Sequence, residues 1–509
     1  MSFRQTVPGL LLALSLISTP AFAAPPEQQH AAPGSGGVLS LLPPDAVSDH
    51  VLNAGGRSLA YTATAGTLDL FGQDGQRSAA IFYTAYVAKN RDASRPVTFI
   101  FNGGPGAASA FLNLGLVGPR IVDFGPDGRD GANAKLVDNP QSWLDFTDLV
   151  LIDPIGTGWS RTVKPDDQND FYAVDSDAES LSKAIALYVS HNGRAASPKY
   201  ILGESYGGFR SVKVANSLRE DQGILISGIV MLSPLLEGRY VFGGSDDALG
   251  AALELPSLAA AELERQNAFS DKAVRDAQAF ALSEYLPALA GPPPSGDAGR
   301  AFYGRVAKLT GIPEDVVARN QGFLGSVYRK QSGGSGGEVA SAYDASFLAP
   351  DPYPQSESEH GGDPILDGFV RAYGGVFSSY ARDELGFHTD MTYTLLSSSV
   401  NRQWKWGGRN NGGSRLSAGV TDDLKELLSL SPSFRLMIGQ GYSDVVIPFG
   451  VNKYVLDHMP PSLADRVALK LYRGGHMFYT RPASREQFTG DARAFFASQP
   501  QAQPAVKSN

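Results

Sequence analysis

Residues 203–207 read Gly-Glu-Ser-Tyr-Gly and place a serine between two glycines. The apolar residues 200–202 before them indicate a short strand, and a helical pattern begins near Phe209. On so sharp a strand-to-helix turn a serine stands clear of its sheet, and small neighbours avoid a clash. The chain holds 57 glycines, so the pattern carries weight only through this context. Ser205 is therefore predicted to be a nucleophile.

A serine hydroxyl needs a base to take its proton, and histidine commonly serves as that base. His476 lies in the loop Gly-Gly-His-Met of residues 474–477, after an expected strand over residues 467–472. The other histidines fall in the N-terminal leader, in polar surface stretches, at a helix end or inside a long insertion: His30, His50, His191, His360, His458 and His388. His476 is therefore the predicted base.

A carboxylate that orients the base is expected between serine and histidine, in the chain order Ser…Asp…His of α/β hydrolases. Asp444 meets this condition and follows an expected strand over residues 434–438. Asp153 also ends an expected strand, but it precedes Ser205 in the chain. We therefore expect Asp444 to be the acid, and Asp153 to form hydrogen bonds within its own turn.

The oxyanion of an acyl-transfer intermediate needs two N–H donors that are aimed in advance. Tyr206, which follows the nucleophile, is expected to supply one of them. The other is expected from a glycine loop after an early strand, and residues 102–106 read Asn-Gly-Gly-Pro-Gly after an apolar run at 97–101. Gly103 and Gly104 are the candidate donors.

Strands and helices alternate along most of the chain, which predicts an α/β fold with a mostly parallel sheet covered by helices on both faces. The alternation of strands and helices is interrupted between residues 239 and 429, where long alanine- and leucine-rich helical stretches indicate an insertion on the sheet. The predicted organisation is a signal peptide (1–23), a disordered leader (24–48), a core in two parts (49–238 and 430–497) separated by a helical cap (239–429), and a polar tail (498–509).

The first 23 residues have the pattern of a secretory signal peptide. Arg4 precedes an apolar run at 9–17, and Ala-Phe-Ala at 21–23 forms a cleavage site before Ala24. The apolar run is too short to span a membrane, which takes about 20 residues. We therefore expect an exported protein, periplasmic or extracellular, with no membrane span.

The composition excludes several classes of function. The 509 residues carry a net charge of −9 and show no basic stripe, which argues against nucleic-acid binding. The chain has no cysteine, which excludes thiolate nucleophiles, thiolate metal sites and disulfides. No group of histidines and carboxylates has the spacing of metal ligands, so neither a metal nor an organic cofactor is predicted.

These motifs, in this order, resemble the serine carboxypeptidase family, in a bacterial-type branch without cysteine. The resemblance runs from Asn102 to Met477 and includes Asp-Pro-Ile-Gly-Thr-Gly-Trp-Ser at 153–160. It implies an α/β hydrolase with a helical insertion that releases C-terminal residues from peptides. By motif it implies Ser205, Asp444 and His476 as the catalytic residues and Gly104 with Tyr206 as oxyanion donors. It also implies that Asn102 and Glu204 bind the terminal carboxylate of the substrate.

The chain departs from the family pattern at two positions of the expected carboxylate site. The family usually has tryptophan where Ile100 stands and a second glutamate where Leu116 stands. Glu204 is expected to be buried on the turn, and burial raises the pKa of a carboxyl group. A protonated Glu204 could donate a hydrogen bond to the substrate carboxylate. With the second glutamate replaced by Leu116, a looser preference for free C-termini is expected.

Other functions compatible with the same residues are an esterase, an acyltransferase or a proline-releasing aminopeptidase. The aminopeptidases typically have histidine in place of Asn102. A secreted binding protein that keeps the fold without activity is a further alternative, which the complete set of Ser205, Asp444 and His476 disfavours. A requirement for a free C-terminal carboxylate would distinguish these enzymes.

Overall fold

A computed structural model describes residues 37–498, except 90–93, 126–130, 132, 245, 334–336, 357–359 and 410–412. The predicted signal peptide and most of the polar tail lie outside these residues. The strands are β1 (Ala46–Ala54), β2 (Arg57–Phe71), β3 (Arg77–Ala88), β4 (Val97–Phe101), β5 (Arg120–Asp123), β6 (Lys135–Asp138), β7 (Asp148–Ile152), β8 (Arg161–Thr162), β9 (Lys199–Glu204), β10 (Gly228–Leu232), β11 (Glu338–Ala340), β12 (Leu348–Pro350), β13 (Arg435–Gly441) and β14 (Val467–Tyr472).

The α-helices fall into those of the core and those of the inserted region. The core helices are α1 (Ala110–Leu112), α2 (Val174–His191), α3 (Tyr206–Asp221), α14 (Phe449–Asp457), α15 (Pro461–Ala464) and α16 (Pro482–Ala497). The region between β10 and β13 holds α4 (Gly238–Val241), α5 (Ala248–Arg265), α6 (Asp271–Phe280), α7 (Leu286–Ala290), α8 (Gly296–Thr310), α9 (Glu314–Arg319), α10 (Tyr328–Gln331), α11 (Leu366–Asp383), α12 (Ser398–Gln403) and α13 (Thr421–Leu430). No helix among the described residues is long and apolar enough to cross a membrane.

The central sheet has the strand order β1-β2-β3-β7-β4-β9-β10-β13-β14, and β8 pairs with β3. The six strands β7, β4, β9, β10, β13 and β14 run parallel to one another. The strands β1, β2 and β3 form an antiparallel meander at one edge. Every residue of β4, β7, β9 and β10 is buried, as expected for the interior of a parallel sheet. The predicted α/β-hydrolase architecture is confirmed by this mostly parallel sheet and the helices around it.

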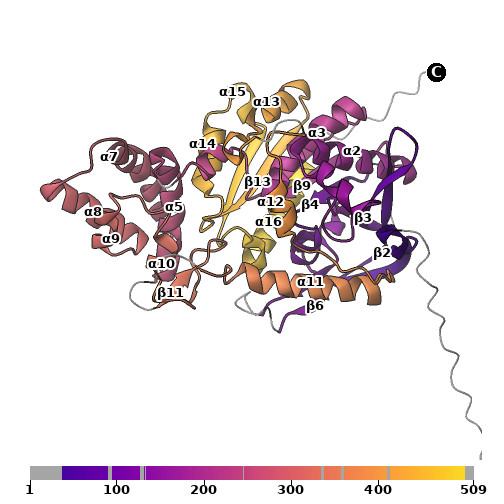
Figure 1. Cartoon of the computed structure of the whole chain (residues 1–509), viewed down its shortest axis with the longest axis horizontal. Helices are drawn as coiled ribbons and strands as arrows, with labels where there is room; N and C mark the ends of the chain where they lie inside the picture. Colours follow the sequence, from indigo (N-terminus) through magenta and orange to yellow (C-terminus); the bar gives the residue numbers. More distant parts are fainter. Residues whose placement is uncertain are drawn as a thin grey trace, which may run out of the picture. The chain divides into compact units, whose positions relative to one another are not determined.

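Each face of the sheet is covered by its own helices, because successive strand residues point to opposite sides. On β4, Phe99 belongs to a cluster with residues of α2, α3 and α13. The next residue, Ile100, belongs to the opposite cluster, which includes residues of α11 and α16. In Figure 1 the core helices lie around the strands, and α5 and α7 to α10 gather together to the left of the sheet. Those inserted helices have a hydrophobic core of their own.

The topology brings four loops to one edge of the sheet. In parallel strands the carboxyl ends lie at the same edge, which is where open α/β sheets bind ligands. The glycine loop follows β4, the serine turn follows β9, the loop with Asp444 follows β13, and the loop with His476 follows β14. Residues more than 370 positions apart in the chain thus meet at one place.

The structure differs from the sequence-based expectation at two elements. Part of the segment assigned to a disordered leader is ordered, because Val38–Leu41 form a 3-10 helix and β1 begins at Ala46. The strand β1 pairs along its whole length with β2, which provides backbone hydrogen bonds that composition does not reveal. The helix after the serine begins at Tyr206, three residues earlier than expected.

Candidate active site

Ser205 lies at the junction of β9 and α3 with φ +60° and ψ −126°, a conformation that residues with side chains rarely adopt. Its N–H donates to the carbonyl of Leu232, 2.9 Å away, and its own carbonyl accepts from the Gly208 N–H at 2.9 Å. A Cβ at Gly203 would lie 2.1 Å from the Gly207 carbonyl oxygen, so the turn can close this tightly only with glycine. The sharp turn predicted around Ser205 is therefore present.

The glycine loop after β4 packs directly against this turn. A Cβ at Gly103 would lie 2.7 Å from the backbone nitrogen of Tyr206, so the two backbones touch. Gly104 has φ +99°, in the region that favours glycine. The guanidinium of Arg210 donates to the Asn102 carbonyl, and its Nε lies 2.6 Å from an Asp177 carboxylate oxygen. This buried ion pair fixes the backbone of the loop beside the serine.

His476 and Asp444 are joined by a hydrogen bond of 2.9 Å between Nδ1 and Oδ2. The other oxygen of Asp444 accepts from the backbone N–H groups of Val446 at 2.9 Å and Ile447 at 3.0 Å. With the carboxylate ionised, Nδ1 must carry a proton, which leaves Nε2 free to accept one. The Asp444 side chain therefore fixes both the orientation and the tautomer of the imidazole.

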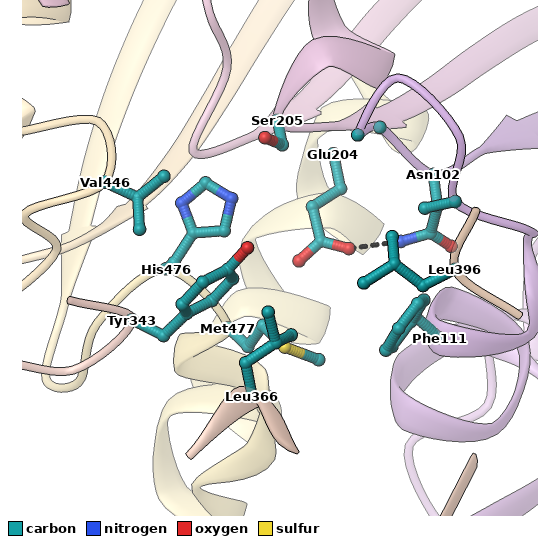
Figure 2. A pocket seen from close by; sticks show the side chains of 13 residues that line it. Asn102, Phe111, Glu204, Ser205, Tyr343, Leu366, Leu396, Val446, His476 and Met477 are labelled. Atoms are coloured by element: carbon teal, nitrogen blue, oxygen red, sulfur yellow. Dashed lines mark hydrogen bonds between the residues drawn. The ribbon is translucent and has the colours of Figure 1, made fainter. Parts of the chain in front are cut away.

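A cavity of about 110 Å³ lies between these groups. Its lining residues are Asn102, Gly103, Gly104, Ala107, Phe111, Glu204, Ser205, Tyr343, Leu366, Leu396, Val446, His476 and Met477. Figure 2 shows Ser205 beside the His476 ring, with the Glu204 carboxyl and the Tyr343 hydroxyl pointing into the same space. The wall also includes apolar side chains, among them Phe111, Leu366, Leu396 and Met477.

The pKa of His476 is shifted by opposing causes. Burial alone would lower it, but the charge of Asp444, its hydrogen bond and the charge of Glu204 raise the pKa above its ordinary value. A histidine with a raised pKa is a stronger base once it is neutral, and it is protonated over a wider range of acid pH.

Glu204 is a buried carboxyl group with three hydrogen-bond contacts. The Asn102 amide donates to Oε2, and the Tyr479 hydroxyl lies 2.9 Å from Oε1 and 3.1 Å from Oε2. Burial raises the pKa of Glu204 to about 7, although His476 and the two hydrogen-bond donors oppose the rise. The group can therefore change its protonation state near neutral pH, as anticipated from its place on the turn.

Every residue selected from the sequence is found at this edge of the sheet. Ser205, His476, Glu204, Asn102, Gly103 and Gly104 line the cavity, Asp444 holds His476, and the Tyr206 backbone nitrogen adjoins the glycine loop. Asp153 forms the expected hydrogen bond within its own turn through its backbone carbonyl, which accepts from the Ser160 hydroxyl at 2.6 Å. Its carboxylate accepts from the N–H of Ser109 at 2.8 Å and its hydroxyl at 2.7 Å, a contact that was not expected.

Two site residues were missed by reasoning from the sequence. Tyr343 comes from the inserted region, and its carbonyl accepts from the His476 N–H. Tyr479 follows the histidine loop and contacts Glu204. No motif marks either tyrosine. The only available signal was that Tyr479 stands three residues after His476.

Comparison with known proteins finds similarity to one protein family over part of the chain. The model of the serine carboxypeptidase family matches residues 62–230, which include the glycine loop and Ser205 but not Asp444 or His476. A carboxypeptidase Y homolog of Arthroderma benhamiae is 26% identical over 161 residues, 31% of this chain and 30% of that protein. Vitellogenic carboxypeptidase of Aedes aegypti is 30% identical over 139 residues, 26% of this chain and 27% of that protein. The chain thus spans about a third of the length of these relatives.

Solved structures with low sequence identity also align with the chain. A proline iminopeptidase of Mycobacterium smegmatis has 15% identity and a TM-score of 0.38, and 85% of this chain and 97% of that chain are covered. A soluble variant of monoglyceride lipase from Saccharomyces cerevisiae has 13% identity and a TM-score of 0.39, with 84% and 93% covered. Over residues 62–230, which carry the glycine loop and the serine turn, the chain is similar to the serine carboxypeptidase family.

Proposed function

We propose that this chain is a serine carboxypeptidase that hydrolyses the C-terminal peptide bond of a peptide through an acyl-enzyme. The observation that carries the proposal is the shared cavity. It holds a serine on a strained turn, a histidine bonded to a buried aspartate, and a buried glutamate within one small space. The similarity to serine carboxypeptidases over residues 62–230 supports the same conclusion.

In the first step Ser205 Oγ attacks the carbonyl carbon of the scissile bond, and His476 Nε2 accepts the hydroxyl proton. The negative charge then forms on the carbonyl oxygen. The backbone N–H groups of Gly104 and Tyr206 are the proposed donors to this oxyanion, because the glycine loop adjoins Tyr206 at Gly103, beside the serine. Asp444 stabilises the imidazolium that forms and keeps its tautomer.

In the second step the imidazolium of His476 gives its proton to the leaving amine, and the C-terminal residue departs. The acyl group remains on Ser205 as an ester. A water molecule then attacks the ester carbonyl while His476 takes its proton. His476 passes this proton to Ser205 Oγ as the ester bond breaks, which regenerates the serine and releases the shortened peptide.

Glu204 and Asn102 are the proposed binding groups for the terminal carboxylate of the substrate. The Asn102 Nδ2 group donates one of its two hydrogens to Glu204, and the other can be donated to a substrate carboxylate. A neutral Glu204 can donate a hydrogen bond to a carboxylate, whereas an ionised Glu204 would repel it. Preference for a free C-terminus therefore depends on the protonation of Glu204.

The cavity also indicates which substrates fit. Its wall includes Phe111, Leu366, Leu396 and Met477, and no lysine or arginine lines it. An apolar side chain next to the cleaved bond would bury surface there, at about 25 cal/mol per Å². A basic side chain would lose hydration, and the one carboxyl group in the wall, Glu204, is already assigned to the terminal carboxylate of the substrate. We expect apolar residues to be preferred.

A panel of N-blocked dipeptides tests the proposed activity. Each peptide is offered with a free-acid and with an amide C-terminus, and the released residue is quantified. We expect release of the C-terminal residue, a preference for the free acid near pH 6, and faster cleavage for apolar side chains. The N-terminal block excludes an aminopeptidase. Hydrolysis of simple esters without release from any blocked dipeptide would instead establish an esterase.

The N-terminal pattern supports export, and the proposed location is the periplasm or the extracellular space. The cleavage site at 21–23 predicts that the mature chain begins at Ala24. The measurement is the intact mass of protein recovered from outside the cytoplasm. A mass that retains Met1 would contradict the proposal.

A further inference from the structure

The Tyr479 hydroxyl contacts the Glu204 carboxyl group. It lies 2.9 Å from Oε1 and 3.1 Å from Oε2, so it can donate to either carboxyl oxygen. Tyr479 lies in a 3-10 helix (Phe478–Thr480) directly after the histidine loop. Its side chain is fully buried, and it does not line the cavity. Tyr479 therefore cannot touch a substrate and can act only through Glu204.

The other partner of Glu204 is held in one orientation. The Asn102 side-chain oxygen accepts from the Leu112 N–H at 3.1 Å, which turns its NH₂ group toward Glu204 Oε2. Oε2 thus has a permanent amide donor, so a proton on neutral Glu204 is best placed on Oε1. Oε1 is the oxygen nearer to the Tyr479 hydroxyl.

A phenol hydroxyl donates a stronger hydrogen bond to a carboxylate than to a neutral carboxylic acid. A donor that binds the ionised form more tightly favours loss of the proton. Burial acts in the opposite direction, because it penalises the charged form. The hydroxyl of Tyr479 therefore moderates the effect of burial on Glu204.

Several other groups with charge or titratable protons face Glu204. They come from the 443–447 loop, the histidine loop and the inserted region: Asp444, His476, Tyr343 and Tyr373, with Arg485 acting on Tyr373. Of these, His476 favours ionised Glu204 and Asp444 opposes it. Among the tyrosines, Tyr479 is the one with hydrogen bonds to both Glu204 oxygens.

The position where serine carboxypeptidases usually carry a second glutamate is apolar here. Leu116 is fully buried and offers no hydrogen bond from its side chain. Nearby, a Cβ at Gly115 would lie 2.7 Å from the Tyr373 hydroxyl and 2.9 Å from a ring carbon of Tyr479. Tyrosine rings thus fill the space beside this segment, and Tyr479 gives Glu204 a neutral partner.

We propose that Tyr479 is a positioning residue that sets the pH at which Glu204 loses its proton, and thereby the upper pH limit for binding peptides with a free C-terminal carboxylate. The proposal rests on the proposed carboxypeptidase function and deepens it. Tyr479 orients the carboxyl group toward the cavity and stabilises its ionised form. Without the hydroxyl, Glu204 keeps its proton to higher pH.

The test compares wild type with Tyr479→Phe, which removes only the hydroxyl. The matched control is Tyr285→Phe, because Tyr285 is an equally buried tyrosine in the inserted helices whose hydroxyl donates to the Gly322 carbonyl. KM and kcat are measured against pH for a blocked dipeptide and for its amide. In Tyr479→Phe the pH at which the free-acid KM begins to rise should move up by about 1 pH unit, because the lost hydroxyl binds the ionised carboxylate more tightly than the neutral acid. The amide KM should not move, and Tyr285→Phe should match wild type.

A second measurement reads Glu204 directly and needs no substrate. The infrared carbonyl stretch of protonated carboxyl groups is titrated, and the signal lost in Glu204→Gln is assigned to Glu204. Its midpoint should lie higher in Tyr479→Phe than in wild type and Tyr285→Phe. Equal midpoints, or superimposable free-acid KM curves, would overturn the role of Tyr479. If wild type released no residue from any blocked dipeptide, the proposed function would fail, and the infrared midpoints would still decide the role of Tyr479.

Discussion

The ring of Tyr343 packs edge-on against the imidazole of His476, with centroids 5.2 Å apart and planes at 84°. The two residues also share a backbone hydrogen bond from the His476 N–H to the Tyr343 carbonyl. We call residues 341–347 the bracing segment. This segment also contacts the 443–447 loop that carries Asp444, because the Ala345 N–H donates to the Ser443 carbonyl at 2.9 Å. The inserted region therefore holds both members of the His476–Asp444 pair.

Substitution at Gly475 tests the bracing segment. A Cβ at this position would lie 1.8 Å from the Tyr343 carbonyl oxygen and 2.5 Å from the Asp344 Cα, so Gly475→Ala must displace the segment. A displacement of about 1 Å at a catalytic group can cost roughly 10²-fold in rate. We expect kcat/KM on a blocked dipeptide to fall by about that factor.

The control for this substitution is Gly490→Ala in helix α16, where a Cβ would meet nothing within 4 Å. That change should leave kcat/KM unaltered and stabilise the fold by about 0.5–1 kcal/mol, because alanine loses less backbone freedom than glycine in a helix. Wild-type activity in Gly475→Ala would show that the bracing segment does not position His476.

The buried Asp177–Arg210 pair provides a prediction about stability. Both side chains are almost fully buried, and Arg210 also bonds to the Asn102 carbonyl. Arg210→Met leaves Asp177 without its partner, and breaking a buried pair on one side typically costs about 3–5 kcal/mol. We expect the free energy of unfolding in urea at pH 7 to fall by this amount. Lys272→Met, which breaks the exposed Lys272–Asp276 pair on α6, should change it little. Equal stability of the two variants would contradict the structural role of Arg210.

The pH dependence of activity follows from His476 and Glu204. The pKa of His476 is raised, so activity on any substrate should fall as pH drops and the imidazole becomes protonated. The pKa of Glu204 is raised to about 7, so free-acid peptides should bind less well above that pH, where Glu204 is ionised. The free-acid substrate should therefore give a bell-shaped profile of kcat/KM, and its amide only the acid limb.

Glu204→Gln separates the two limbs. The glutamine stays neutral at all pH values, so the alkaline limb for free-acid peptides should disappear. The charge of Glu204 also raises the pKa of His476, so the acid limb should move to lower pH in the variant. The measurement is kcat/KM from pH 4 to 9 for both substrates. Identical profiles in wild type and variant would mean that Glu204 only supports the turn.

The sequence allowed much of the sheet and the chemical groups to be predicted because both rest on local patterns. The apolar run at Val467–Tyr472 coincides with strand β14, and the turn around Ser205 depends on glycines that lie next to it in the chain. Chain order was enough to select Asp444, which the structure places 2.9 Å from His476.

Contacts between distant segments were not predictable in this way. Tyr479 contacts Glu204, which lies 275 positions earlier in the chain, and no motif in the sequence indicates this contact. Tyr343 belongs to an insertion without a recognisable motif. The donors to the Asp153 carboxylate come from Ser109, which lies 44 residues earlier in the chain. The looser preference for free C-termini expected from Leu116 stays a prediction.

The central claim is that Ser205 is a nucleophile activated by His476 and Asp444. Ser205→Ala and His476→Ala should each lower kcat by several orders of magnitude, and the double variant should be little worse, because such residues act as a unit. Asp444→Asn should be severely impaired, because the imidazole would take the wrong tautomer.

The most direct measurement is covalent labelling of the folded protein with a fluorophosphonate, followed by digestion and mass spectrometry. A fluorophosphonate reacts with an activated serine and not with an ordinary one. We predict a single adduct on the peptide that carries Ser205, and much slower labelling in His476→Ala. An adduct on a different serine, or cleavage of peptides by a protein whose Ser205 stays unlabelled, would contradict the account.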